Sequence, residues 1–217
     1  MGMKKIIIED WYRKTQYNNF INYTNPVFSI GTNLDVTKLV SYCEERKISF
    51  FSVFLYVVTR CINEIDEMKY RIMDGGVVMF DEIHPGYVVL CDNNELRTCV
   101  TRYNCNFHAF YDQTRIDIKK TKENECISYN ENNGLDSFYI SCLPWIRFNS
   151  LSNPYNFADK EQTSIPRITW GKYYKNGDIY EINFDISGHH ALIDGMQACE
   201  FIKKVEDQLS TLSYLEG

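Results

Sequence analysis

The sequence predicts an α+β protein in which several helices pack against a β-sheet. Two observations predict this class. Apolar residues recur at helical spacing in separate stretches, and short runs rich in β-branched and aromatic residues, divided by turn residues, lie between those stretches. With 217 residues, 44% of them hydrophobic, the chain is long enough to bury a substantial core. We therefore expect one domain that spans residues 1–217.

The first third of the chain is expected to contain three helices and one strand. Residues 6–23 form a polar and aromatic stretch that fits a helix and loop, which Pro26 ends. Residues 28–30 fit a strand, and Asp35 stands in the capping position of a following helix. Residues 49–65 are apolar almost all round, which predicts a buried helix.

The middle of the chain is expected to form short strands and one helix. Gly75 and Gly76 follow Asp74 in a turn, and three β-rich runs come next, at residues 77–81, 87–91 and 96–101. Residues 107–122 fit a helix. The polar tract 123–134 that follows is expected to be a loop.

The last third is expected to supply three strands, at residues 139–141, 165–174 and 179–186. Asn176 and Gly177 separate the last two and fit a type I′ hairpin turn. The hairpin leads to the pair His189-His190. Apolar residues between 196 and 209 then recur at helical spacing, so the chain is expected to close with an amphipathic helix.

Charge and cysteine usage exclude several kinds of function. A formal charge of −6 without a concentrated basic patch argues against nucleic acid or an anionic membrane as partner. The longest apolar stretch, 50–58, is far too short to cross a membrane, and no secretion signal starts the chain, so we expect a cytoplasmic protein. The eight cysteines are scattered without metal-ligand spacing, which predicts reduced thiols and no bound metal.

The segment from Gly188 to Gly195 is the strongest candidate for a catalytic site. It places His189 and His190 directly before Asp194 and Gly195, with three residues between the second histidine and the aspartate. A fixed, neutral imidazole can take a proton from a hydroxyl at physiological pH. The alternative is structural: Asp194 caps the following helix and the histidines are polar turn residues.

Four segments together resemble the chloramphenicol acetyltransferase family. They are the histidine segment just described, Trp11-Tyr12-Arg13, the run from Ser141 to Trp145 and the run from Thr169 to Tyr173. The resemblance implies a two-layer α/β sandwich with a mixed sheet, acetyl-CoA as acyl donor, and a small-molecule hydroxyl as acceptor. Larger proteins with the same motif join two such units in one chain. The single unit here implies a homotrimer whose active sites lie between subunits.

The resemblance also implies a role for each matched residue. His190 is the general base, His189 is mainly structural, and Ser141 donates a hydrogen bond to the oxyanion of the intermediate. Asp194 is implied to pair with Arg13 as a structural residue, and to be wrongly oriented to form a catalytic triad with the base. The remaining matched positions are Thr169, which would order a water near the intermediate, and the coenzyme A channel residues Trp145, Lys172 and Tyr173. For Thr169 and Tyr173 an ordinary strand position is an open alternative.

The acceptor pocket is where the sequence departs from the family. The matched positions are Asn19, Phe20, Thr24, Arg97, Leu151 and Asn153. Several of these are polar where the family has apolar side chains, and a buried unpaired amide or guanidinium would penalise a ligand such as chloramphenicol. Three hypotheses follow: inactivation of the antibiotic chloramphenicol by O-acetylation, the same transfer to a more polar hydroxyl compound, or a non-catalytic trimeric scaffold.

Overall fold

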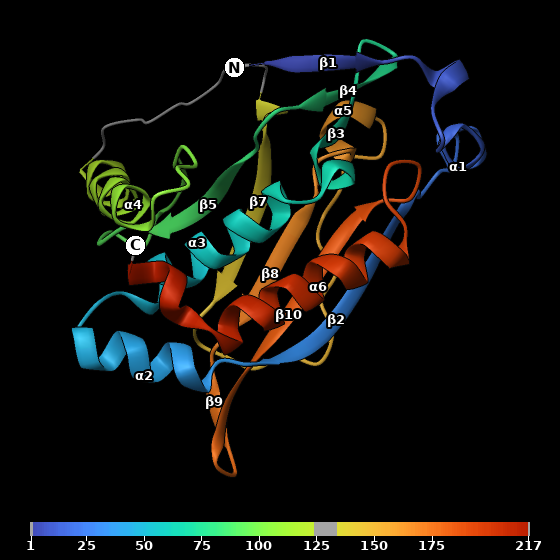
Figure 1. Cartoon of the computed structure of the whole chain (residues 1–217). Coiled ribbons are helices and arrows are strands. Elements are labelled where there is room, and N and C mark those ends of the chain that lie inside the picture. Colours follow the sequence, from blue (N-terminus) through green and yellow to red (C-terminus); the bar gives the residue numbers. More distant parts are fainter. Residues whose placement is uncertain (1, 124–133, 217) are drawn as a thin grey trace.

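A mixed β-sheet of seven strands forms the centre of the molecule (Figure 1). The computed structural model describes residues 2–123 and 134–216, so most of the predicted polar loop lies outside the described residues. The strands of the sheet follow the order β2 (Val27–Asp35), β10 (Ile179–His189), β8 (Arg167–Gly171), β7 (Ser137–Leu143), β5 (His84–Leu90) and β6 (Leu96–Val100). β9 (Tyr174–Asn176) pairs with the beginning of β10. The pairs β5–β7 and β7–β8 are parallel and the others antiparallel, so the predicted mixed sheet is confirmed.

A smaller antiparallel sheet stands at one end of the main sheet. It has the order β1 (Met3–Ile6), β4 (Gly76–Phe80), β3 (Tyr70–Met73). Only β4 was predicted. β1 is exposed and has no alternating pattern, and β3 is just four residues long, so neither carries a clear strand signal.

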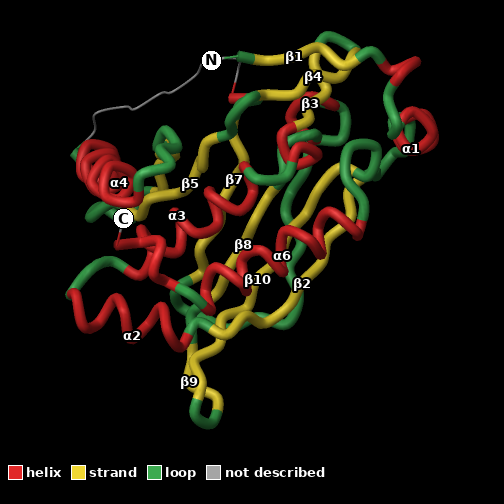
Figure 2. Tube along the Cα trace, viewed as in Figure 1, coloured by secondary structure: helices red, strands yellow, loops and turns green. Residues whose placement is uncertain are grey.

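The longer helices cover one face of the main sheet (Figures 1 and 2). They are α2 (Thr37–Arg46), α3 (Phe50–Asn63), α4 (Phe107–Lys122) and α6 (Gly195–Ser210). The short helices α1 (Lys14–Phe20) and α5 (Lys160–Thr163) lie elsewhere, α5 against β3 of the smaller sheet. α3 is buried along most of its length, as predicted, and packs against α2, α4 and α6. The Trp170 ring of β8 contacts Phe51 and Phe54 of α3. This sheet face therefore holds the apolar core between sheet and helices.

The opposite face of the sheet is polar, and we call it the polar face. Because successive strand residues alternate between faces, Ser141, Thr169 and Asp185 lie on it, in register across β7, β8 and β10. The segment after β7 lies over part of this face. Its Phe148 N–H donates to Asn183 Oδ1 at 3.0 Å. The polar face is therefore covered by irregular chain rather than by a long helix.

Two local predictions need correction. Asp35 is the last residue of β2, and the N-cap of α2 is Val36. The Asp35 carboxylate still accepts the N–H of Thr37, the first residue of the helix. In the β9–β10 hairpin Asn176 pairs with Ile179, so the turn residues are Gly177 and Asp178. Only Gly177 of these has a positive φ, 61°, which fits a II′ turn better than I′. No helix among the described residues is long and apolar enough to cross a membrane.

Candidate active site

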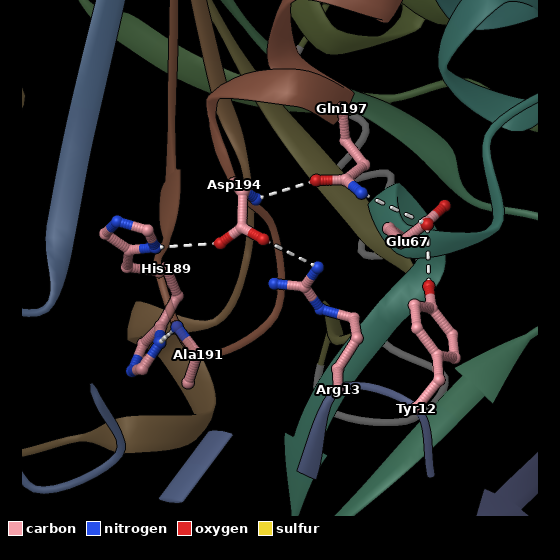
Figure 3. Close-up of polar contacts among 8 residues, drawn as sticks. Tyr12, Arg13, Glu67, His189, Ala191, Asp194 and Gln197 are labelled. Atoms are coloured by element: carbon pink, nitrogen blue, oxygen red, sulfur yellow. Dashed lines mark hydrogen bonds and ion pairs between the residues drawn. The ribbon is translucent and has the colours of Figure 1, made fainter. Parts of the chain in front are cut away.

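The histidine pair stands at the end of β10, where the chain turns toward α6. Gly188 allows this turn, because a Cβ there would lie 2.1 Å from Ile193 Cδ1. The His189 carbonyl accepts hydrogen bonds from the backbone N–H groups of Leu192 and Ile193. His189 Nδ1 accepts the Ala191 N–H at 3.2 Å (Figure 3). Residues 188–193 therefore form a tight turn that fixes both imidazoles.

The two histidines occupy different environments. His189 is 2% exposed, and burial lowers its pKa to about 4, with a smaller contribution from Lys160 and His190. The His189 imidazole is therefore neutral at physiological pH. Its Nδ1 is occupied by a backbone N–H, which suits a structural role.

The side chain of His190 is 35% exposed and lies between aromatic rings. Its imidazole stacks on Phe20, with ring centroids 3.9 Å apart and planes 4° from parallel, and Phe28 lies 5.1 Å away on a tilt. The backbone N–H of His190 donates to the Pro26 carbonyl at 2.8 Å. α1, the chain before β2 and β2 itself thus hold this imidazole in one orientation at the edge of solvent.

Asp194 connects His190 to Arg13. Its Oδ2 accepts a hydrogen bond from Arg13 NH1 at 3.0 Å (Figure 3), and its Oδ1 lies 3.1 Å from His190 Nδ1. The predicted ion pair with Arg13, a residue only 2% exposed, is confirmed. The tight turn brings Asp194 beside His190, but His190 Nδ1 and Asp194 Oδ1 form no hydrogen bond, so the expectation that Asp194 is not oriented as a triad member stays a prediction. Asp194 is also the N-cap of α6, so the structural alternative holds in addition.

A second layer of polar contacts supports Asp194 and was missed by sequence reasoning. The Asp194 N–H donates to Gln197 Oε1 at 2.9 Å, and Gln197 Nε2 donates to Glu67 Oε1 at 3.3 Å. Tyr12 donates its hydroxyl to the same Glu67 oxygen at 2.6 Å (Figure 3). The spacing from Asp194 to Gln197 is that of a capping box and could have revealed Gln197. Nothing near Glu67 in the sequence indicates its part.

Ser141 lies on the polar face, away from the histidine pair. It pairs with Thr169 of β8, which pairs in turn with Asp185 of β10. Thr169 is fully buried, and its Oγ1 makes no hydrogen bond to another described residue. Cys142 faces the helices instead and pairs with Trp170, and burial raises the pKa of its thiol to about 11. Ser141 and Cys142 therefore lie on opposite faces of the sheet.

Asp185 is a candidate that sequence reasoning missed. It is 4% exposed, its Oδ1 is buried without a hydrogen-bond partner among the described residues, and burial raises its pKa to about 6. A signal was present, because Asn183, Asp185 and Ser187 alternate with apolar residues along β10. That alternation marks a polar face on a central strand.

A hollow of about 340 Å³ opens beside Ser141, and we call it the Ser141 hollow. Asn153 lines it and donates from Nδ2 to Ser187 Oγ at 3.1 Å, while Leu151 lies half-buried two residues earlier. Arg97 is not there. Its guanidinium donates to Glu95 and to the Thr121 carbonyl at the end of α4, on the helix side of the sheet. The neighbouring Thr98 lines the hollow instead, because a shift of one residue along a strand changes the face.

The other predicted acceptor residues lie near His190 rather than near Ser141. Phe20 contacts the His190 imidazole directly. Asn19 precedes it at the end of α1 and Thr24 follows in the next turn, both close to the surface. The predicted acceptor residues therefore divide into two groups within the chain.

The predicted coenzyme A residues are partly brought together. The Lys172 N–H donates to the Ile146 carbonyl at 2.9 Å, so Lys172 lies next to Trp145, and both side chains are exposed. Tyr173 packs its ring against Phe50 of α3 at 4.8 Å. Tyr173 lies between β8 and β9 rather than within a strand, and its part in binding coenzyme A stays a prediction. Among residues 2–123 and 134–216, no group of His, Cys, Asp and Glu side chains is arranged to hold a metal ion.

Comparisons with known proteins agree with this geometry. The family model described as chloramphenicol acetyltransferase matches residues 1–206. Chloramphenicol acetyltransferases from Campylobacter coli and Clostridium butyricum are 29% and 28% identical over 212 residues, covering 97% and 95% of this chain and 100% and 94% of those proteins. A solved chloramphenicol acetyltransferase superposes with a TM-score of 0.85 at 28% identity, covering 96% of this chain and 100% of that one.

A more distant structure shares the fold alone. The dihydrolipoamide acetyltransferase of Azotobacter vinelandii superposes with a TM-score of 0.71 at 15% identity, covering 94% of this chain and 89% of that one. The fold and the histidine site thus define an acyltransferase enzyme. The chain belongs to the chloramphenicol acetyltransferase family, whose acyl donor is acetyl-CoA.

Proposed function

We propose that residues 1–217 form one catalytic unit that transfers the acetyl group of acetyl-CoA to a hydroxyl of a small molecule. The geometry around His190 carries this proposal. The Asp194 carboxylate lies 3.1 Å from Nδ1 without a hydrogen bond to it, and its negative charge favours a proton on that nitrogen, which leaves Nε2 as the proton acceptor. Stacking on Phe20 fixes the ring. The imidazole is therefore oriented as a general base and partly open to a substrate.

The reaction follows from these positions. The acceptor hydroxyl gives its proton to His190 Nε2 while its oxygen attacks the thioester carbonyl and forms a C–O bond. Ser141 donates a hydrogen bond to the oxyanion, and the unpaired Thr169 hydroxyl beside it is suited to hold a water there. The C–S bond then breaks, and the proton passes from Nε2 to the departing thiolate. The products are an acetyl ester and free coenzyme A.

His190 and Ser141 cannot serve one reaction within one chain. Ser141 lies two strands from β10, in register with Asp185, and His190 is five residues further along. At about 4.8 Å between strands and about 3.3 Å per residue, the two are on the order of 15–20 Å apart. We therefore propose a homotrimer in which His190 of one subunit faces the Ser141 hollow of its neighbour.

Exposed apolar side chains support this assembly. Val88 and Leu90 of β5 and Leu96 of β6 are exposed. Leu90 pairs with Leu96 on the polar face, beside the Ser141 hollow. An apolar strip of this kind is typical of a surface that another protein chain covers.

Mixing two inactive variants tests the shared site. His190→Ala and Ser141→Ala chains, refolded together in equal amounts, should form trimers in which about a quarter of the sites combine an intact His190 with an intact Ser141. We expect about that fraction of wild-type activity, and light scattering should give the mass of a trimer. A fully active monomer, or no recovered activity in confirmed mixed trimers, would contradict the shared site.

The coenzyme A binding surface is proposed around Trp145 and Lys172. Trp145 offers an exposed aromatic surface, and the Lys172 ammonium can offset phosphate charge in an acidic protein. Arg147 adds a second cation nearby, with its guanidinium carbon 4.4 Å from the centre of the Tyr174 ring. These groups lie on the segments that follow β7 and β8.

For the acceptor, chloramphenicol is one candidate, because similar relatives carry that name. A more polar hydroxyl compound is the other candidate, and the side chains of Thr98, Asn153 and Arg167 in the wall of the Ser141 hollow favour it. An assay of thiol release from acetyl-CoA with a panel of hydroxyl compounds tests both. We expect release that depends on the acceptor, with an acetyl ester as product. If none of the acceptors in the panel supported thiol release, the proposed function would be contradicted.

A further inference from the structure

The wall of the Ser141 hollow contains a positive charge. Arg167 lines the hollow together with Ser141, Thr98 and Asn153. Ser141 pairs with Thr169, two residues after Arg167 on β8, so Arg167 is a diagonal neighbour of Ser141, at about 7–8 Å. Any acceptor whose hydroxyl reacts beside Ser141 must therefore fit next to this guanidinium.

The guanidinium of Arg167 is held firmly but is not neutralised. Its central carbon lies 3.8 Å from the centre of the Tyr155 ring and 5.8 Å from that of Tyr139. Its NH1 donates to the Pro154 carbonyl. Its Nε is buried without a hydrogen-bond partner among the described residues, and no carboxylate in residues 2–123 and 134–216 forms an ion pair with it. The chain thus positions a cation and leaves the countercharge to a ligand.

The acidic side chain on this part of the polar face does not compensate Arg167. Asp185 leans across β10 toward β2, since its Oδ2 lies 3.5 Å from the position a Cβ would take at Gly31. β2 lies on the far side of β10 from β8, the strand that carries Arg167. The Tyr139 hydroxyl is directed to Gln162, to which it donates at 3.1 Å. Asp185 therefore does not occupy the Arg167 guanidinium, which is available to an anion in the hollow.

We infer that the acceptor of this enzyme is a small hydroxy acid whose carboxylate binds Arg167 while its hydroxyl is acetylated beside Ser141. The planar guanidinium matches a carboxylate in geometry and charge. The short span from Arg167 to Ser141 selects molecules in which only a few bonds separate carboxylate and hydroxyl. The product is the O-acetyl ester of the same acid. This inference rests on the proposed O-acetyl transfer and assigns Arg167 as the residue that determines acceptor specificity.

Matched acceptor pairs test the inference on the full-length enzyme. The pairs are N-acetylserine, 3-hydroxybutyrate and 4-(hydroxymethyl)benzoate, each with its primary amide, and chloramphenicol serves as a neutral reference. Each pair keeps the hydroxyl and removes only the charge. We expect kcat/KM to favour the carboxylate of at least one pair about tenfold or more. A preference for the amide in every pair, or for chloramphenicol over all of the acids, would overturn the inference.

Substitution of Arg167 gives a second, independent result. Arg167→Gln should lower kcat/KM for the preferred acid about tenfold, mainly through a higher KM, and change its amide by less than about threefold. Arg167→Lys should restore part of the preference. Arg46→Gln is the matched control, because Arg46 also lies over a tyrosine ring, Tyr42 at 4.0 Å, but on α2. An equal loss for acid and amide in Arg167→Gln would show a purely structural role and overturn the inference.

Binding measured without acetyl-CoA separates this inference from the proposed reaction. Calorimetry compares each acid with its amide on wild type and on Arg167→Gln. Tighter binding of the acid that depends on Arg167, without thiol release, would refute the acetyl transfer and retain the anion site. Thiol release without any difference between acid and amide would retain the acetyl transfer and refute the anion site.

Discussion

The turn that carries His189 and His190, which we call the histidine corner, differs from the polar face in the pairing of its charged side chains. In the corner, Arg13 is paired with Asp194, which also approaches the His190 ring. On the polar face, Asp185 and Arg167 form no ion pair with any other residue of the described chain. Both regions lie on or beside β8 and β10. The difference in ion pairing therefore comes from the side chains and not from the strands that carry them.

The contrast separates two ways of preparing a site. A base must hold one orientation before the substrate arrives, and paired charges from the same chain provide that. A binding surface gains specificity when its polar groups remain unpaired until the right ligand binds, because any other ligand leaves them unpaired. The structure places the first arrangement at His190 and the second around Ser141.

The largest expected effect comes from removing the oriented base. His190→Ala should lower kcat roughly 10²–10⁴-fold, because no other side chain placed there can accept the hydroxyl proton. Thermal stability should change little, since the ring is partly exposed. His189→Asn is the control: it should lower the melting temperature but retain measurable turnover. Equal residual rates in the two variants would contradict the assignment of the base, and added imidazole should rescue only His190→Ala.

A smaller loss is expected on the polar face. Ser141→Ala removes the hydroxyl donor to the oxyanion, a change that typically lowers kcat about 10²–10³-fold. Cys142→Ala is the matched control, because the neighbouring thiol faces the helices and its pKa of about 11 keeps it protonated. Steady-state kinetics with the best acceptor checks both. If Cys142→Ala were as slow as Ser141→Ala, the assignment of faces would fail.

The smallest effect concerns stability and its pH dependence. Burial raises the Asp185 pKa to about 6 from 3.8, so the folded state binds its proton more tightly than the unfolded state. The ionised side chain therefore lowers stability at pH 7, and this cost fades as the pH falls from 6 toward 4. Asp185→Asn should raise the free energy of unfolding at pH 7 by about 1–3 kcal/mol. Urea unfolding measures it.

The same experiment at about pH 4.5 sharpens the comparison, because the advantage of Asp185→Asn should then largely vanish. His189 acts with the opposite sign. Its pKa is lowered to about 4, so the protein loses stability as the pH falls from 6.5 toward 4. Both proteins contain His189, so their difference reports Asp185 alone. A loss of stability in Asp185→Asn at pH 7 would mean that a cation of another subunit pairs with Asp185 and would contradict the view of an unpaired charge.

Elements with strong local signals could be predicted from the sequence. α4 has the predicted bounds, because an amphipathic run follows Asn106, whose side chain caps the helix. The Arg13–Asp194 pair was available only through family resemblance, since no local rule connects two positions so far apart. Arg97 was placed in the acceptor pocket because a slip of one residue in a strand exchanges the two faces.

Other parts of the site depend on tertiary packing. Glu67 supports Gln197 and Tyr12 from a short turn after α3, and such a contact has no sequence pattern. The pairing of Arg167 with a tyrosine ring instead of a carboxylate likewise follows from how the segment after β7 lies on the sheet. The closeness of Asp194 to His190 also follows from the tight turn between them.

The position of β10 has a consequence for how the chain is made. β10 is the last strand in sequence, yet it lies between β2 and β8, and β2 has no other neighbour in the described sheet. During synthesis β2 emerges early and keeps an unpaired edge until residues 179–189 leave the ribosome. Pairings of such long sequence separation close slowly, typically in milliseconds to seconds. The nascent chain therefore exposes an open strand edge for most of its translation, a state in which aggregation competes with folding.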